Sequence, residues 1–294
     1  MKIAVTGATG FLGHYLVNHL TRLGHDCRCW RRETSDTGGF DHPDRIEWQI
    51  GELDDPSATQ QLVRDVDAVV HAALAWPSQT ELVEFVQRNV VGSIRLMEAA
   101  RSASVERFVF ISTCAVHEVI LDDRKLDEAH PLWPMRHYGA HKAAIEKFVH
   151  SYGLGDGWPV CALRPTGIYG LARPVEQSRW FETVQRVVRG EDVDSASGGK
   201  EVHAADVARA VTLLLEAKAD DIAGRSFNCY DRYIADAEVA QIAKEIAGSS
   251  SEITNRNPGP KHQIDTSRIR ALGMRFGGDE MLRQTVTELV EAAR

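Results

Sequence analysis

The first thirteen residues, Met1-Lys-Ile-Ala-Val-Thr-Gly-Ala-Thr-Gly-Phe-Leu-Gly13, decide the fold. The apolar, β-branched run from Lys2 to Thr6 predicts a buried strand, and the amphipathic run from Phe11 to Leu23 predicts a helix. A strand that passes through glycines to a helix N-terminus leaves backbone N–H groups unpaired and directed at one point. Such a point suits a pyrophosphate, so the stretch predicts a dinucleotide-binding turn.

The three glycines have different expected roles. Gly7 permits a tight turn, Gly10 lets phosphates approach the backbone, and Gly13 lets the helix pack close to the strand. The alternative is an ordinary glycine-containing turn between a strand and a helix. The place of the triplet, directly after a strand and at the start of a helix, favours the dinucleotide motif.

The bulk composition is that of a soluble globular protein. Of the 294 residues, 43% are hydrophobic and 26% are charged. The net charge of −8 and the lack of a basic run argue against a nucleic-acid partner. No apolar run is long enough to span a membrane, and a strand that begins at residue 2 leaves no room for a signal peptide. We therefore expect a cytoplasmic protein without a membrane partner.

Cysteines and histidines give no sign of a metal site or a disulfide framework. The five cysteines are odd in number and form no CxxC pair, which predicts buried free thiols in a reducing compartment. Among the twelve histidines, His137 and His141 lack an HExxH arrangement. We expect no metal.

Strand and helix patterns alternate through the first 170 residues. Strands are expected at 26–31, 45–49, 67–73, 107–113 and 160–165, and helices at 56–66, 80–104 and 138–152. Repeated βα units predict an α/β fold with a Rossmann-type, doubly wound parallel sheet covered by helices on both faces. Ligands bind at the carboxyl ends of such strands.

The alternation stops after Gly170. Helices are expected at 180–189, 204–217, 236–246 and 279–293, a strand at 226–230, and Gly-, Ser- and Pro-rich loops between them. We expect a dinucleotide-binding domain at 1–170, to which 201–230 returns. Residues 171–200 and 231–294 would form a smaller C-terminal α/β substrate lobe.

The second expected strand ends in two arginines. An acidic residue there selects NAD, whereas an arginine accommodates the 2′-phosphate of NADP. Arg31 and Arg32 occupy this place, so the sequence favours NADP(H), with NAD(H) possible. The alternative is a solvated charge pair at a strand end. Glu52 and Leu53, after the third strand, are placed to approach the adenine.

Tyr138 and Lys142 lie four residues apart on one expected helix, hence on the same face. The strand at 107–113 ends in two hydroxyls, Ser112 and Thr113, where parallel strands present ligands. The Lys142 ammonium is expected to lower the pKa of Tyr138 and make it a proton donor or acceptor near neutral pH. Thr113 or Ser112 would hold a substrate oxygen. The alternative is a surface tyrosine and hydroxyls satisfied by the backbone.

The chain resembles an extended-type short-chain dehydrogenase/reductase of the NAD-dependent epimerase/dehydratase family. Seven segments carry the resemblance in the family's order, and together they are specific: Thr6-Gly-Ala-Thr-Gly-Phe-Leu-Gly13, Val69-Val-His-Ala-Ala73, Asn89-Val-Val-Gly92, Phe108-Val-Phe-Ile-Ser-Thr113, Tyr138 to Lys142, Arg164-Pro-Thr-Gly-Ile-Tyr-Gly170 and Val202-His-Ala-Ala-Asp-Val207.

The resemblance implies roles by position. Tyr138 is the catalytic acid/base, Lys142 binds the nicotinamide ribose, and Thr113 takes the catalytic Ser/Thr place, with Ser112 beside it. Asn89 supports the active site. The implied cofactor-binding residues are Gly7, Thr9, Gly10, Phe11, Leu12, Gly13, Arg31, Arg32, Glu52, Leu53, Ala72, Ala73, Asn89, Lys142, Arg164, Pro165 and Thr166.

The chain departs from the family pattern in four ways. Threonine replaces the commoner serine at 113, Glu52 stands where aspartate is usual, and His117 stands where nucleotide-sugar enzymes usually carry tyrosine. Residues 171–200 and the tail after 230 are short and poor in the arginine-aromatic pattern of a nucleotide-sugar pocket. The last departure weakens the nucleotide-sugar interpretation more than it weakens catalysis.

Three functional hypotheses follow. The first is an NADP-dependent oxidoreductase that interconverts a ketone or aldehyde and an alcohol on a small-molecule or sugar-like substrate, with Tyr138 as acid/base. The second is an NAD-dependent sugar or nucleotide-sugar epimerase or dehydratase. The third is a non-catalytic NADP-sensing protein, against which the tyrosine–lysine pair argues. A homodimer through the helices at 80–104 and 138–152 is possible.

Overall fold

The computed structural model describes residues 1–75 and 81–294 and divides into two units. The first unit comprises Met1–Pro165, Val207–Cys229 and Asp265–Met274. The second comprises Thr166–Asp206, Tyr230–Ile264 and Arg275–Arg294.

A seven-stranded sheet is the centre of the first unit, and all its strands are parallel. The strand order is β10-β6-β5-β4-β1-β2-β3, so the order reverses at β1, beside β4. Val5 of β1 pairs with Cys29 of β2 and with Val70 of β4. The strands are β1 (Lys2–Thr6), β2 (Asp26–Arg31), β3 (Ile46–Ile50), β4 (Ala68–His71), β5 (Arg107–Ile111), β6 (Val160–Pro165) and β10 (Arg225–Cys229).

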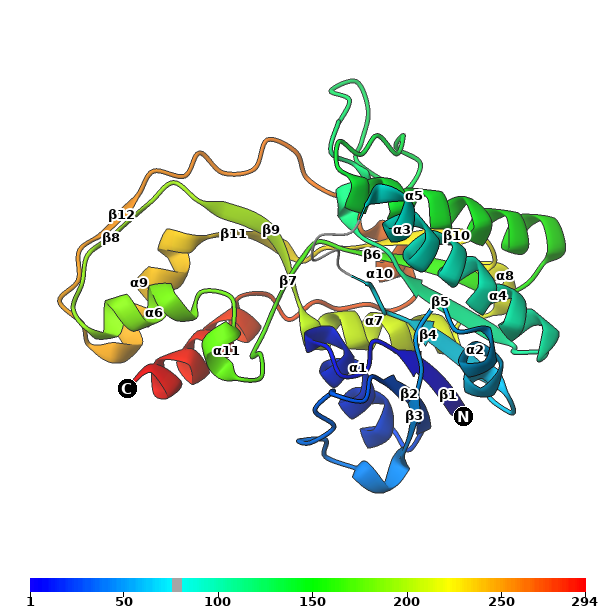
Figure 1. Cartoon of the computed structure of the whole chain (residues 1–294). Coiled ribbons are helices and arrows are strands. Elements are labelled where there is room, and N and C mark those ends of the chain that lie inside the picture. Colours follow the sequence, from blue (N-terminus) through cyan, green and yellow to red (C-terminus); the bar gives the residue numbers. More distant parts are fainter. Residues whose placement is uncertain (76–80) are drawn as a thin grey trace. The chain divides into compact units, whose positions relative to one another are not determined.

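Helices cover both faces of this sheet, and Figure 1 shows α4 and α5 on one side with α1 and α7 on the other. Apolar side chains of α2, α4 and α5 pack with those of the central strands in one core cluster. The helices are α1 (Phe11–Arg22), α2 (Pro56–Val63), α3 (Leu82–Val86), α4 (Gly92–Ser102), α5 (His137–His150), α7 (Ala204–Glu216), α8 (Ala219–Ile222) and α10 (Ser267–Ala271). Helical turns of other types are η1 (Pro43–Arg45), η2 (Gln87–Val91), η3 (Cys114–Val116) and η4 (Ser151–Gly155).

The second unit has its own small sheet and core. Its three-stranded sheet has the order β11-β9-β7, and β8 and β12 form a separate parallel pair. The strands are β7 (Gly167–Tyr169), β8 (Val193–Ser195), β9 (Gly198–His203), β11 (Arg232–Ala235) and β12 (Ile253–Asn255). The helices are η5 (Val175–Gln177), α6 (Phe181–Val188), α9 (Asp236–Ala247) and α11 (Gly278–Ala293). Apolar faces of α6, α9 and α11 form the core.

The structure confirms the expected α/β fold with a Rossmann-type parallel sheet. β1, β2 and β6 have the expected bounds, and Asp55 caps α2 by accepting hydrogen bonds from the backbone N–H groups of Ser57 and Ala58. The helix expected at 80–104 is interrupted by the π-helical turn η2, and its first residue lies outside the described part of the chain. Strands β7, β8, β9, β11 and β12 had no counterpart in the prediction.

The units also divide the chain differently from the expected boundaries. The first unit ends at Pro165 rather than at 170, and Asp265–Met274 belongs to it. Hydrogen bonds hold this late segment to β10: Asn228 Nδ2 donates to the Asp265 carbonyl (3.1 Å), and Arg268 Nη1 donates to the Ser226 carbonyl (2.9 Å). Sequence patterns do not reveal such bonds between distant segments. Among the described residues, no helix has the length and apolarity needed to cross a bilayer.

Candidate active site

The turn between β1 and α1 depends on its glycines. Gly7 has a φ of +74°, a conformation that strains other residues. A Cβ atom on Gly13 would lie 2.0 Å from the Gly7 carbonyl oxygen, so only glycine lets α1 pack this close to β1. A Cβ on Gly10 would meet only the Gly7 carbonyl oxygen, at 3.3 Å. The conformational roles expected of Gly7 and Gly13 are therefore present.

A cavity of about 590 Å³ lies against this turn, within the first unit. Its volume lies in the usual range for small-molecule and cofactor sites. Twelve of the predicted cofactor-binding residues line it: Gly7, Thr9, Gly10, Phe11, Leu12, Gly13, Arg31, Arg32, Glu52, Leu53, Ala72 and Ala73. Eight further residues that were not predicted from the sequence also line it: Trp30, Ser35, Asp36, Gly51, Asp54, Leu74, Ala75 and Arg88. The first turn of α1 supplies unpaired N–H groups there, which suits the phosphates of a dinucleotide.

Arg31 and Arg32 line the part of the cavity formed by the end of β2. Arg31 Nη1 donates to the backbone carbonyls of Arg32 (3.3 Å) and Glu33 (3.4 Å). Across residues 1–75 and 81–294, neither arginine forms an ion pair, whereas Arg88 pairs with Glu84 at 3.1 Å. The guanidinium groups at 31 and 32 are therefore free of carboxylate partners beside the cavity.

The cavity wall at residues 72–75 is held by buried polar groups. Thr6 Oγ1 accepts a hydrogen bond from Ala73 N (3.1 Å) and contacts His71 Nδ1 (2.7 Å). Asn89 Oδ1 accepts from Ala75 N (2.9 Å), and Asn89 Nδ2 donates to the Ala75 carbonyl (3.0 Å). Asn89 is in the π-helical turn η2 and is not among the lining residues. It therefore stabilises the cavity wall through its hydrogen bonds to the Ala75 backbone without facing the cavity.

Tyr138, Lys142 and Thr113 gather where β5 ends and α5 begins. The side chain of Tyr138 is hydrogen-bonded to that of Thr113. Lys142 Nζ donates to the Ile111 carbonyl (2.7 Å) and lies 4.6 Å from the centre of the Phe110 ring. A Cβ on Gly139 would lie 2.5 Å from the Ala115 carbonyl oxygen, so this glycine lets the start of α5 approach the segment that follows Thr113.

The expected electrostatic effect of Lys142 on Tyr138 is wrong for this structure. Burial raises the pKa of Tyr138, and the hydrogen bond to Thr113 opposes that rise. Burial also lowers the pKa of Lys142 to about 7, against the opposing effect of the Glu146 charge. Desolvation is the largest cause of both pKa shifts, and sequence spacing does not reveal burial.

The buried Lys142 predicts a pH-dependent stability. Its folded-state pKa of about 7 lies below the ordinary value of 10.5, so the unfolded chain binds a proton that the folded chain has lost above pH 7. Stability from this group therefore rises with pH, by about 1.5 kcal/mol between pH 7 and pH 8.5. Urea unfolding at both pH values should show this rise in the wild type and in Lys147→Met, whose lysine is an exposed neighbour on α5. Its persistence in Lys142→Met would contradict the prediction.

The remaining predicted site residues lie elsewhere. The Ser112 hydroxyl hydrogen-bonds to Glu146, which turns it away from the role expected beside Thr113. Arg164 is 1% exposed and its guanidinium is bound to Glu146, so its side chain is not open to a cofactor. Pro165 ends β6, and Thr166 begins the second unit. None of these residues lines the cavity.

These features define a dinucleotide-binding protein of the α/β class: a parallel sheet, a glycine turn onto a helix and a cavity at the carboxyl ends of the strands. Residues 3–229 match the model of the NAD dependent epimerase/dehydratase family. The chain belongs to this family, which confirms the resemblance seen in the sequence.

Relatives from several organisms span nearly the whole chain. A low-salt glycan biosynthesis protein of Haloferax volcanii is 27% identical over 293 residues, with 93% of each chain covered. The UDP-glucose 4-epimerase of Azospirillum brasilense is 26% identical over 304 residues, which cover 92% of this chain and 85% of the epimerase.

Solved structures show the same fold. The UDP-glucose 4-epimerase of Thermotoga maritima, crystallised with UDP-glucose, matches with a TM-score of 0.82, 22% identity and full coverage of both chains. The UDP-glucose 4-epimerase of Thermus thermophilus, crystallised with NAD, matches with a TM-score of 0.77 and 24% identity, covering 98% of this chain and 99% of that one.

Proposed function

We propose that this protein is an NAD(P)-dependent enzyme that oxidises or reduces a hydroxyl-bearing carbon of a sugar or sugar-nucleotide substrate, with Tyr138 as the acid/base. The observation that carries the proposal is the cluster at the end of β5 and the start of α5, where burial raises the pKa of Tyr138 and Thr113 lowers it, and where Lys142, one helical turn along, donates from Nζ to the Ile111 carbonyl at 2.7 Å. The cavity beside the glycine turn supports a dinucleotide, and the full-length relatives that are epimerases support a sugar-nucleotide substrate.

Each residue has a defined task. A bound dinucleotide would accept or return hydride at its nicotinamide ring. During reduction Tyr138 donates its phenolic proton to the developing alkoxide, and the phenolate so formed takes the proton of the substrate hydroxyl during oxidation. Thr113 holds the same oxygen, and Lys142 supplies a hydrogen-bond donor one helical turn from Tyr138. The glycine turn and the α1 N-terminus hold the pyrophosphate, while Glu52 and Leu53 contact the adenine.

Dehydration is a less suitable reaction for this site. It needs an additional acid/base pair beside Thr113, but the next two residues are Cys114 and Ala115. The Cys114 thiol donates to the Arg164 carbonyl, and burial raises its pKa to about 12. Glu118 accepts hydrogen bonds from the backbone N–H groups of Met135 and Arg136, so it is occupied before α5. Epimerisation or simple oxidoreduction needs no such pair.

A second candidate is an NADP(H)-dependent ketone or aldehyde reductase, and the arginine pair favours it. Arg31 and Arg32 lack carboxylate partners among the described residues and line the cavity where a 2′-phosphate would lie. The comparisons, by contrast, favour NAD, which is bound in the Thermus thermophilus structure. We propose a preference for NADP(H) on the strength of the two arginines alone.

Binding affinities test the cofactor choice. Calorimetric titration should show that NADPH binds more tightly than NADH, and that Arg31→Ala and Arg32→Ala weaken NADPH binding by roughly 10- to 100-fold because a charge-assisted bond to phosphate is lost. NADH binding should be unchanged. Arg88→Ala is the matched control: Arg88 also lines the cavity but is paired with Glu84, so its loss should not change the preference. Tighter NADH binding, or NAD retained through purification, would instead support the epimerase over the reductase.

A further inference from the structure

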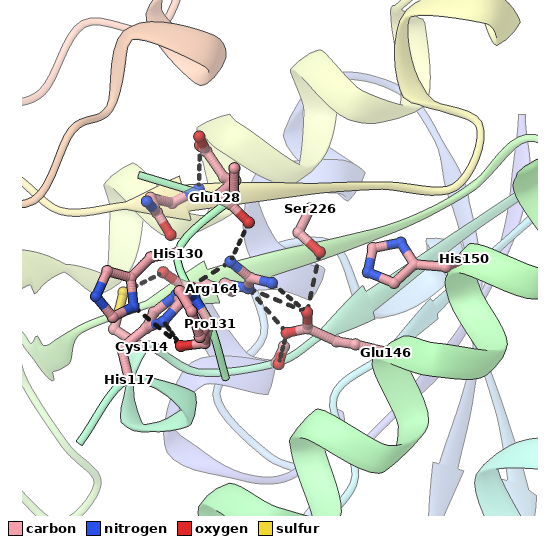
Figure 2. A network of polar contacts seen from close by, with 12 residues as sticks. Cys114, His117, Glu128, His130, Pro131, Glu146, His150, Arg164 and Ser226 are labelled. Carbon is pink, nitrogen blue, oxygen red and sulfur yellow. Dashed lines mark hydrogen bonds and ion pairs between the residues drawn. The ribbon is translucent and has the colours of Figure 1, made fainter. Parts of the chain in front are cut away.

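Glu146 and Arg164 form a buried ion pair within a network of polar contacts (Figure 2). Glu146 is 0% exposed and Arg164 is 1% exposed. Two guanidinium nitrogens reach the carboxylate: Arg164 Nη2 lies 2.6 Å from Glu146 Oε2, and Nε lies 3.0 Å from Oε1. Such a pair is costly to desolvate and stays charged only with further hydrogen bonds.

Two serine hydroxyls provide those hydrogen bonds on the carboxylate side. Ser112 Oγ donates to Glu146 Oε1, and Ser226 Oγ donates to Glu146 Oε2 at 3.0 Å. Burial alone would raise the pKa of Glu146, but the Arg164 charge and these hydrogen bonds hold it below its usual value. Glu146 is therefore a carboxylate at neutral pH, and from its place on α5 it is joined to Ser112 directly after β5, to β6 and to β10.

The Arg164 guanidinium also donates hydrogen bonds to groups other than Glu146. Arg164 Nη1 donates to His117 Nε2 (3.1 Å) and to the Glu128 carbonyl (3.3 Å). Burial and the Arg164 charge lower the pKa of His117 to about 4, so its ring is neutral and can accept this bond. His117 thus completes the network in the place where the family's nucleotide-sugar enzymes usually carry tyrosine.

The sequence positions of the network connect it to the proposed chemistry. Tyr138, Lys142 and Glu146 occupy positions i, i+4 and i+8 of α5, hence one face of the helix. Ser112 immediately precedes Thr113, the partner of Tyr138. The hydrogen bond between Ser112 and Glu146 therefore joins two segments. One is the chain at the end of β5, which carries the Thr113 hydroxyl, and the other is α5, which carries the Tyr138 hydroxyl.

We propose that Glu146 is a positioning residue that acts through Ser112: it fixes the end of β5 against α5 and thereby sets the distance between Thr113 and Tyr138. The importance of this geometry for turnover rests on the proposed function. Ser226 also donates to Glu146, but it lies on β10, which carries none of the proposed reacting groups.

The two serines form a matched pair for the test. Both are buried, 3% and 2% exposed, and each gives one hydrogen bond to the same carboxylate. Ser112→Ala and Ser226→Ala should therefore lose similar stability. Only Ser112→Ala should alter the relation between Thr113 and Tyr138.

The direct readout is the Tyr138 signal in the NMR spectrum of the full chain labelled with ¹³C at the tyrosine ring, assigned by its loss in Tyr138→Phe. We expect Ser112→Ala to shift this signal and Ser226→Ala to leave it in place. Equal shifts in both variants, or none in Ser112→Ala, would overturn the proposal. If Ser112→Ala fails to fold, Glu146→Met/Arg164→Met, which leaves the Ser112 hydroxyl without its acceptor, should show the same shift, and an unmoved signal there would also overturn the proposal.

A kinetic measurement separates this proposal from the proposed function. With UDP-glucose and dinucleotide as probes, Ser112→Ala should lower kcat roughly tenfold with KM unchanged, because misplacement of reacting groups affects the chemical step. Ser226→Ala should have neither effect. If the wild type is inactive, the proposed activity on this probe fails while the NMR result still decides the role of Glu146. If the wild type is active and both variants have equal kcat, the positioning role is refuted.

Discussion

Replacement of Tyr138 by phenylalanine is expected to lower kcat by about a thousandfold and to leave dinucleotide affinity unchanged. The phenol is the proposed proton donor and acceptor. Loss of general acid/base catalysis typically lowers the reaction rate by roughly 10²–10⁴-fold. The ring itself remains, so the packing of α5 is preserved. Steady-state kinetics with UDP-glucose, together with calorimetric titration of the dinucleotide, would measure both quantities.

Tyr152→Phe is the matched control for this experiment. Tyr152 follows α5 in the turn η4, and its hydroxyl bonds to Glu98 at the surface of the unit. The same loss of one phenolic hydroxyl should leave kcat within twofold of the wild type. Wild-type turnover by Tyr138→Phe would contradict the mechanism, because the phenylalanine ring has no hydroxyl with which to transfer the proton.

Replacement of Glu146 by glutamine is expected to have the largest effect on stability. It leaves the Arg164 guanidinium buried without its counter-charge, and breaking a buried pair in this way costs about 3–5 kcal/mol. The double variant Glu146→Gln/Arg164→Met removes both charges and should recover most of that loss. Urea unfolding of the wild type and the two variants measures the free energies directly.

The contrast between the single and double variants is the informative result. A single variant as stable as the wild type would show that the pair is not desolvated as described. A double variant no more stable than the single one would show that the lost contacts, rather than the unpaired charge, cause the destabilisation. Either result would contradict the account of the network.

Local sequence signals were sufficient for the sheet and the glycine turn. The β-branched run in β1 and the three glycines define a strand, a turn and a helix within thirteen residues, so no long-range information is needed. The alternation of apolar runs located most strands of the first unit. The short strands of the second unit were missed, because β7 and β9 are three and six residues long and their paired residues, such as Gly167 and Glu201, are far apart in the sequence.

The candidate site was predictable in its residues but not in its energetics. Twelve of the predicted cofactor-binding residues line one cavity, whereas Arg164 is directed into the interior and Asn89 supports the wall from behind. An arginine before a proline gives no sequence signal for a buried ion pair. The raised pKa of Tyr138 and the lowered pKa of Lys142 arise from burial, which is known only once the chain is folded.

The most direct test of the central claim, that the cavity beside the β1–α1 turn holds a nicotinamide dinucleotide, is calorimetric titration of the purified protein with NADPH and NADH. We expect one dinucleotide to bind per chain. We also expect adenosine diphosphate to compete for the same site, because the glycine turn would contact the pyrophosphate. Failure of both dinucleotides to bind, in protein shown to be folded and free of retained dinucleotide, would contradict the assignment of the cavity and the mechanism built on it.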